Sequence, residues 1–327
     1  MENENMEFQS RVDLTKIQSK VELIKKEISK SLVGQEQMVE LILTAILTGG
    51  HVLIEGVPGV AKTLTAKLVS KVINADYGRI QFTPDLMPSD ILGTSIYNPK
   101  LGEFEFKKGP IFKNLVLIDE INRAPAKTQS ALFEVMEEQQ ISMDGVKYTL
   151  APPFFVMATQ NPVEHEGTYR LPEAQLDRFL FKINVDYPSM ENELNILKNK
   201  SMNKFENPMI AVNQVISSQE IEEFKALLDD VIVDDVIYKY IVEIIQLSRN
   251  FHSVYLGASP RAGIMLLRSA QAFAILNGRD FVTPEDIQTL CVPLLSHRLI
   301  LTPEKEMEGI TTADVIKDLL HAVEVPR

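Results

Sequence analysis

The sequence contains one cysteine, five histidines and no long apolar run, and these shortages exclude several classes of protein. Cys291 is the only cysteine in 327 residues, so the chain has neither an intrachain disulfide nor a cysteine-based metal cluster. The five histidines are scattered, and none lies at metal-ligand spacing from another. No apolar run approaches the length needed to cross a bilayer, so we expect no membrane span.

Basic residues are also scarce relative to acidic ones. The chain has 33 lysines and arginines against 45 aspartates and glutamates, which gives a net charge of −12 at pH 7. This balance argues against nucleic acid as a partner, because nucleic-acid-binding domains carry a basic surface.

The N-terminus is polar and acidic, without the basic start and apolar stretch of a signal peptide. We therefore expect a cytoplasmic protein.

The composition otherwise fits a globular protein of two domains. Hydrophobic residues make up 45% of the chain and charged residues 24%, which allows a substantial core. A chain of 327 residues is long for one domain. The character of the sequence changes near residue 189, so we predict an N-terminal helix with an α/β core over residues 1–189 and a helical domain over residues 190–327.

Short runs of Val, Ile, Leu and Phe recur in the first part, separated by helical stretches. They occupy residues 51–54, 78–82, 115–118, 154–158 and 179–185. Near-continuous apolar strands that alternate with helices indicate an α/β fold with a parallel five-stranded sheet covered on both faces. Helical spacing of apolar residues also predicts helices before the first strand, over residues 12–31 and 36–48.

Two segments interrupt the alternation and are predicted as inserted β-hairpins. In residues 93–112, acidic and aromatic side chains alternate at Glu103–Phe106 between flanking glycines. Residues 140–150 contain Asp144-Gly145, a strong turn signal.

After residue 189 the pattern is amphipathic helix without comparable strand-like runs, so we predict an all-helical lid domain. The N-caps expected there are Ser218, Asp234, Ser259 and Thr283.

The strand at residues 51–54 leads into a loop and a helix typical of a phosphate-binding site. Successive backbone N–H groups and the positive end of the helix dipole would face bound phosphates. Lys62 would reach the β- and γ-phosphates, and the Thr63 hydroxyl would bind Mg²⁺. The loop residues that would surround ATP are Gly56, Val57, Pro58, Gly59, Val60, Ala61, Lys62, Thr63 and Leu64.

Ala61 departs from the general pattern G-x-x-x-x-G-K-[ST], which has glycine before the lysine. Alanine resists the positive φ that glycine adopts without cost. The alternative interpretation is a Gly-Pro turn followed by a surface lysine.

Two further strands end in polar residues suited to phosphoryl transfer. Asp119 would hold Mg²⁺ and Glu120 would polarise the attacking water, since both follow the apolar run at residues 115–118. Asn161 follows the run at residues 154–158 and would orient that water. By themselves, the acidic pair is also compatible with a solvated loop, and Asn161-Pro162 with a simple turn.

Taken in order, the motifs GVPGVAKT, LVLIDEINRAP, MATQNP, GTYRLPEAQLDRF and SPRA resemble the MoxR family of AAA+ ATPases. The resemblance runs from about Val33 to the C-terminus. The related magnesium-chelatase ATPase subunits are similar in carrying two hairpins at the inserted positions. Ala61 matches the GVPGxAKT motif of proteins similar to MoxR, so the departure from the general pattern agrees with the resemblance.

The resemblance implies a role for each matching residue, with ATP and Mg²⁺ as cofactors. In the resemblance, the Walker A loop runs from Gly56 to Lys62, and Asp119 and Glu120 form Walker B. Thr63 and Asp119 would bind Mg²⁺. Asn161 matches sensor 1, and Arg178 matches the arginine finger that a neighbouring subunit supplies. Arg261 matches sensor 2, while Val33 and Gly34 match the loop that lines the adenine pocket.

For the arginines the sequence leaves other interpretations open. Arg178 can instead pair with Asp177 or Glu173, and Arg261 can be an ordinary surface residue. Arg123 and Arg170 are second choices for the finger.

The implied function is an ATP-driven, chaperone-like machine that remodels or activates client proteins as a homo-oligomeric ring, and a monomer is expected to turn over ATP slowly. A hexamer is expected, and partners with a von Willebrand factor A domain are implied. The alternatives are a chelatase-type motor that inserts metal into a tetrapyrrole, a DNA-directed AAA+ ATPase and a small-molecule kinase. The acidic charge disfavours the DNA-directed protein, and a kinase leaves Asn161, Arg178 and Arg261 without a shared purpose.

Overall fold

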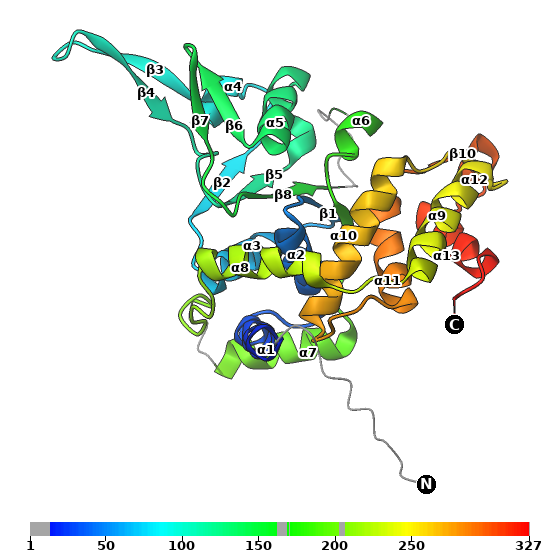
Figure 1. Ribbon diagram of the computed structural model, residues 1–327. Helices are drawn as coiled ribbons and strands as arrows, with labels where there is room; N and C mark the ends of the chain where they lie inside the picture. Colours follow the sequence, from blue (N-terminus) through cyan, green and yellow to red (C-terminus); the bar gives the residue numbers. More distant parts are fainter. Residues whose placement is uncertain (1–13, 162–168, 170, 203–206, 327) are drawn as a thin grey trace.

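A five-stranded parallel sheet organises the first part of the chain, as predicted. The computed structural model describes residues 14–161, 169, 171–202 and 207–326 (Figure 1). The strands lie in the order β2-β5-β8-β1-β9. Their bounds are β1 (Val52–Gly56), β2 (Tyr77–Gln81), β5 (Leu115–Asp119), β8 (Phe155–Gln160) and β9 (Phe181–Val185), each within two residues of the predicted position at its start.

The sheet is buried on both faces because successive side chains point to opposite sides of each strand. On β1, Val52 and Ile54 join one apolar cluster, with helices α1 (Thr15–Ser29), α2 (Glu36–Thr48) and α3 (Lys62–Val72). Leu53 joins the second cluster, which contains the apolar face of α5 (Ala126–Glu138). Apolar side chains on both faces explain why these strands read as continuous hydrophobic runs.

Both predicted hairpins are present and project together from one end of the sheet (Figure 1). The first pairs β3 (Gly93–Asn98) with β4 (Glu103–Lys108), after the short helix α4 (Pro88–Leu92). The second pairs β6 (Gln140–Met143) with β7 (Val146–Thr149). The rings of Phe106 and Tyr148 lie 4.5 Å apart, so the two hairpins contact each other.

The chain crosses back over its first helices after the sheet ends. Helix α7 (Met190–Met202) follows β9, and the segment that leads to α8 (Ser218–Ala226) lies against α1 and α3. There Lys71 Nζ donates to Met209 O, and the backbone N–H of Val215 donates to Val72 O at 2.9 Å. These contacts attach the start of the second part firmly to the first, and the boundary near residue 189 stays a prediction.

The described residues of the second part are mainly helical, but they also form a short sheet that contradicts the all-helical prediction. Residues 254–256 (β10) and 300–301 (β11) pair as a small antiparallel sheet, which was too short to register as a strand pattern. The further helices of the second part are α9 (Asp235–Asn250), α10 (Pro260–Leu276), α11 (Pro284–Leu295), α12 (Pro303–Met307) and α13 (Thr312–Ala322). The 3₁₀ turn η2 (Leu227–Asp230) precedes α9, and the 3₁₀ turn η1 (Ile121–Arg123) follows β5 in the first part. Within the described ranges, no helix combines the length and apolar character needed to cross a membrane.

Most of the predicted N-caps are correct. Asp234 accepts from the backbone N–H of Val236, and Thr283 forms a capping box with Asp286. The prediction of Ser218 was wrong by one residue, because Ser217 forms the capping box with Glu220. Ser259 lies at the N-cap of α10 but makes no side-chain capping bond.

We predict that Asp286→Ala lowers the free energy of unfolding by about 3 kcal/mol, because its carboxylate both caps α11 and pairs with Arg279. Asp286 is buried, and its Oδ2 accepts from Arg279 at 2.7 Å and from the backbone N–H of Thr283 at 2.9 Å. Urea unfolding measures the change. The exposed Asp318→Ala on α13 is the control, expected within about 0.5 kcal/mol of the parent; equal losses in the two variants would contradict the prediction.

Candidate functional site

The loop between β1 and α3 has the backbone geometry of a phosphate cradle. Gly59 has a φ of +90°, and a Cβ built there would meet no atom within 4 Å, so this side of the loop is open. At Gly56, by contrast, a side chain has no room, because a Cβ there would lie 2.6 Å from Val185 O. The first backbone N–H groups of α3 lack partners within the helix by its geometry, and they point toward this loop.

Ala61 adopts the left-handed conformation that the general motif assigns to glycine. Its φ of 61° and ψ of 19° place it at the N-cap of α3. A left-handed alanine costs roughly 1–2 kcal/mol relative to ordinary backbone conformations. The loop therefore keeps the shape of the glycine-containing motif despite the alanine, and the strain is stored at the start of the helix.

Lys62 belongs to the loop and is not a surface lysine. Its Nζ donates to Gly56 O at 2.6 Å, so the ammonium lies across the loop between β1 and α3. Thr63 follows in the first turn of α3, partly buried. The Thr63 hydroxyl, on the helix after β1, and the Asp119 carboxylate, at the carboxyl end of the parallel strand β5, are oxygen ligands of the kind that Mg²⁺ prefers. The residue types present at this edge therefore fit ATP with Mg²⁺.

The sheet order brings the predicted acidic pair beside this loop. Strand β8 lies between β1 and β5, and all three run in the same direction. Thr159 Oγ1 on β8 donates to Asp119 Oδ1 at 3.2 Å and accepts from the backbone N–H of Glu120 at 3.1 Å. Asn161 follows β8 directly and is buried, at the same edge of the sheet. Asp119 is therefore buried at the end of β5 and not part of a solvated loop, while Glu120 beside it is half-buried.

Strand β2 supplies polar partners for both carboxylates that the sequence analysis missed. Arg79 Nε contacts Asp119 Oδ2 at 2.6 Å, and Gln81 Nε2 donates to Glu120 Oε2 at 2.8 Å. Arg79 and Gln81 point to the same face of β2, two residues apart, and this alternation was the available signal. The pKa of Arg79 is raised by its hydrogen bond to Asp119, and burial followed by the charge of Asp119 raises the pKa of Tyr77 to about 12.

Glu120 is held in an unusual backbone conformation. Its φ of 57° is in the left-handed region, at the turn between β5 and η1. Arg123, a second choice for the finger, lies with its Nε 3.1 Å from Glu120 Oε2 of the same chain. Arg123 is therefore a neighbour of the acidic pair in its own subunit, and Arg170 lies outside the described residues.

The predicted adenine loop borders a large open cavity at the same edge. Gly34 lines a cavity of about 770 Å³, together with residues 183–189 at the end of β9 and beyond it, residues of α11, and Lys317 of α13. The φ of Gly34 is +73°, which favours glycine, and a Cβ there would lie 2.2 Å from Asn192 Nδ2 and displace that side chain. Val33 faces a separate, smaller cavity of about 170 Å³ against α7.

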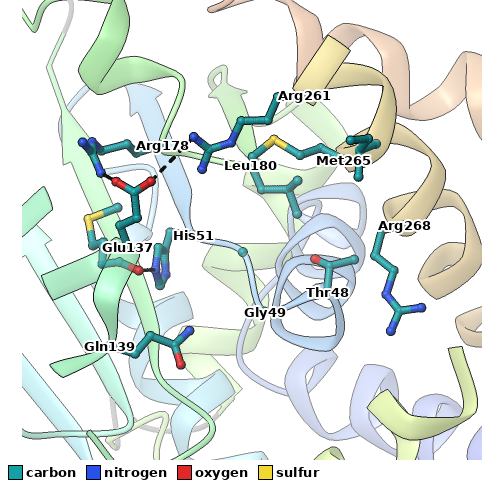
Figure 2. Close-up of a pocket in the computed structure, with 13 residues that line it drawn as sticks. Thr48, Gly49, His51, Glu137, Gln139, Arg178, Leu180, Arg261, Met265 and Arg268 are labelled. Atoms are coloured by element: carbon teal, nitrogen blue, oxygen red, sulfur yellow. Dashed lines mark hydrogen bonds and ion pairs between the residues drawn. The ribbon is translucent and has the colours of Figure 1, made fainter. Parts of the chain in front are cut away.

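Arg178 and Arg261 lie together at the opposite edge of the sheet. Both guanidinium groups point to Glu137, at the end of α5 (Figure 2). Arg178 is in direct ion-pair contact with this carboxylate, and Arg261 Nη1 lies 3.8 Å from it. The pairing of Arg178 with Asp177 or Glu173 that the sequence left open is not the one observed. These arginines line a cavity of about 310 Å³ with Arg268.

His51 fixes the end of α5 on which Glu137 lies. Its Nε2 is 3.1 Å from Met136 O, and its Nδ1 accepts from the backbone N–H of Val156 at 3.1 Å. Burial lowers the pKa of His51 to about 4, so the ring is neutral near pH 7 and Nε2 carries the hydrogen. A neutral ring beside two guanidinium groups adds no repulsion to the cluster.

The two groups of predicted residues are separated by the length of the sheet. Leu180 N donates to His51 O at 2.7 Å, which places Arg178 and His51 where β9 and β1 begin. The phosphate loop follows Gly56, where β1 ends. Five residues of strand span roughly 16 Å, well beyond the reach of an arginine side chain. The phosphate loop and the two arginines of one chain therefore do not meet.

Both parts of the chain are similar to known protein families. Residues 51–181 match the ATPase family associated with various cellular activities (AAA), and residues 246–319 match the AAA lid domain. The chain is 42% identical to Chaperone MoxR1 of Mycobacterium tuberculosis over 92% of its own length and 81% of the relative. It belongs to the MoxR family of AAA+ ATPases. It is an ATPase by this family membership.

Other relatives of this MoxR-family chain extend over almost its whole length. It is 50% identical to the protein YeaC of Bacillus subtilis, over 92% of the chain and 93% of that protein. A crystal structure from Cytophaga hutchinsonii, described as an ATPase, is 43% identical and superposes with a TM-score of 0.88 over 96% of the chain and 97% of that structure. The α/β core with its lid is therefore shared with a solved protein, and the predicted fold is confirmed.

We predict that Ala61→Gly raises the free energy of unfolding by about 0.5–1 kcal/mol, since glycine removes the strain at φ 61° but costs more backbone entropy. ATP turnover should be retained, because the loop keeps its shape. Thermal or urea unfolding measures the first quantity. Ala66→Gly in the middle of α3 is the matched control and should be destabilising; a loss of stability in Ala61→Gly would contradict the account of the loop.

Proposed function

We propose that this protein is an ATP-driven, chaperone-like machine that acts on client proteins as an oligomeric ring. The single observation that carries the proposal is the separation of the phosphate loop from Arg178 and Arg261 in one chain. The name of the relative Chaperone MoxR1 supports the chaperone class. A hexameric state, a cytoplasmic setting and a partner with a von Willebrand factor A domain stay predictions from the resemblance.

The residues at the carboxyl edge of the sheet are assigned to nucleotide binding and water activation. The loop from Gly56 to Lys62 binds the phosphates of ATP through backbone N–H groups and the Lys62 ammonium. Thr63 and Asp119 would hold Mg²⁺, which neutralises phosphate charge when bound. Glu120 takes the proton of the attacking water, and Asn161 orients that water. Gln81 Nε2 donates to Glu120 Oε2 at 2.8 Å and so orients the carboxylate that accepts the proton.

The arginines at the amino edge are assigned to the site of the next subunit. As phosphoryl transfer proceeds, negative charge on the phosphate oxygens is stabilised by a planar guanidinium. Arg178 and Arg261 of one chain converge on Glu137, so both are available at the same surface (Figure 2). A neighbouring chain that presents its phosphate loop to this surface completes one site. A ring closes every such interface without leaving a free end.

The hairpins are assigned to the client. Their outer surface exposes large apolar side chains, including Leu101 at 63% and Phe104 at 72%. The Ser95 hydroxyl hydrogen-bonds to Asp144, and Phe106 stacks near Tyr148, so β3-β4 and β6-β7 are joined to each other. Exposed apolar groups on a joined pair of hairpins suit contact with a partly unfolded protein segment.

The first test is Glu120→Gln, which removes the general base while keeping the side-chain shape. We expect turnover to fall by about 10²-fold or more with ATP affinity retained. Steady-state hydrolysis and nucleotide titration measure the two quantities. Glu134→Gln on the adjacent helix α5 is the control and should keep full turnover. Unimpaired hydrolysis in Glu120→Gln would remove this residue from its assigned role.

The second test separates an arginine that acts in its own chain from one that acts in the next. Arg178→Ala should lower turnover by about 10³-fold, the low end of measured arginine-finger effects. Mixing it with Glu120→Gln should restore activity in part, because intact phosphate loops then meet intact arginines. Arg261→Ala should behave in the same way. No restoration at any ratio in confirmed mixed assemblies would reject the trans arrangement.

A further inference from the structure

Two lid residues after α11 hold the segment that carries Arg178. The Arg298 guanidinium donates through Nη2 to Phe179 O at 2.6 Å and through Nη1 to Leu180 O at 3.1 Å. Its Nε donates to Asp177 Oδ1 at 2.7 Å, and Nη2 also reaches Asp177 O at 3.2 Å. His297 Nε2 lies 2.9 Å from the same carbonyl of Phe179. The residues on both sides of Arg178 are therefore bound by the lid.

This contact is buried, and all three side-chain nitrogens of Arg298 make hydrogen bonds. The Arg298 side chain is 2% exposed, and its remaining contacts are Leu294 O and Met265 Sδ within the lid. Asp177 supplies the opposing charge. Burial lowers the pKa of His297 well below its usual value, so its ring is neutral and Nε2–H donates to the carbonyl. Breaking such a contact leaves a buried charge and several carbonyl oxygens without partners.

The lid thus carries Arg261 and contacts the segment of Arg178. Arg261 lies in the first turn of α10, four residues before Met265, which contacts Arg298. Arg178 belongs to the α/β core by sequence, but Arg298 ties its backbone to the lid. Glu137 then joins the two guanidinium groups at their tips (Figure 2). The Arg178 segment is also held to the sheet, where Leu180 N donates to His51 O at 2.7 Å, so it lies between the lid and the start of β1. A displacement of the lid relative to the sheet would move Arg261 directly and would strain the contacts that position Arg178.

We propose that Arg298 is a positioning residue for the Arg178 finger, through which the lid of one subunit sets the hydrolysis rate of the next. The inference rests on the proposed function, in which Arg178 acts on the neighbouring subunit. The lid also borders the cavity at Gly34 through Thr289 of α11 and Lys317 of α13. Nucleotide in one subunit can therefore shift the lid, and Arg298 transmits that shift to the finger.

The test is Arg298→Lys, which keeps the charge but loses the forked geometry of the guanidinium. A misplacement of about 1 Å can cost on the order of 10²-fold in rate. We expect kcat to fall about 10- to 100-fold, with KM and ATP affinity unchanged. Adding Glu120→Gln subunits should restore turnover, because their intact fingers then serve the phosphate loops of the Arg298→Lys chains. A merely structural defect within the variant chain would not be restored.

Arg279→Lys is the matched control, since it breaks another arginine–aspartate pair of the lid that does not contact the finger segment. It should lower stability and leave kcat within about twofold. Asp177→Asn is the second variant if Arg298→Lys does not fold; it keeps the carbonyl contacts, and a smaller loss of kcat with the same restoration is expected.

The outcomes separate this inference from the proposed function. An unchanged kcat in Arg298→Lys, or a loss that Glu120→Gln does not restore while Arg178→Ala is restored, would overturn the role of Arg298 alone. If Arg178→Ala is itself not restored in mixed assemblies, the trans arrangement fails, and the role of Arg298 fails with it.

Discussion

The common direction of the five strands is the constraint on which the rest of the structure depends. Because β1 and β9 start at one edge and the phosphate loop follows β1 at the other, one chain holds its phosphate-binding groups and its arginines on opposite sides. Parallel strands place loops of one kind at one edge, so neither helix packing nor side-chain rotation can bring the two groups together. In our proposal the active site therefore belongs to pairs of chains, and the ring supplies those pairs.

Each edge is held in place by contacts that extend well beyond the functional residues. At the carboxyl edge, Arg79 and Gln81 of the outer strand β2 hold Asp119 and Glu120. At the amino edge, His51 fixes the end of α5, while Arg298 reaches from the lid to the segment of Arg178. Polar side chains with several fixed partners lose less freedom when they act, which is why such supporting contacts make a site effective.

Much of the fold and part of the site could be predicted from the sequence, because they depend on local patterns. The buried strands read as apolar runs, and the loop from Gly56 to Thr63 carries its function in consecutive residues. The alternation of Arg79 and Gln81 on β2 was a local signal, but it did not name their partners. The contacts of Arg79, Glu137 and Arg298 could not be found in this way, since the partners lie 40 or more residues away in sequence and meet only in the folded chain. The small β10-β11 sheet was missed because two or three residues carry no periodicity.

The most direct test of a site shared between chains is the dependence of ATP turnover per chain on protein concentration, with the oligomeric state followed by sedimentation in the same samples. The account predicts that turnover per chain is low where the protein is monomeric and rises in parallel with the assembled fraction. Constant turnover per chain across a range in which sedimentation shows only monomer would contradict it.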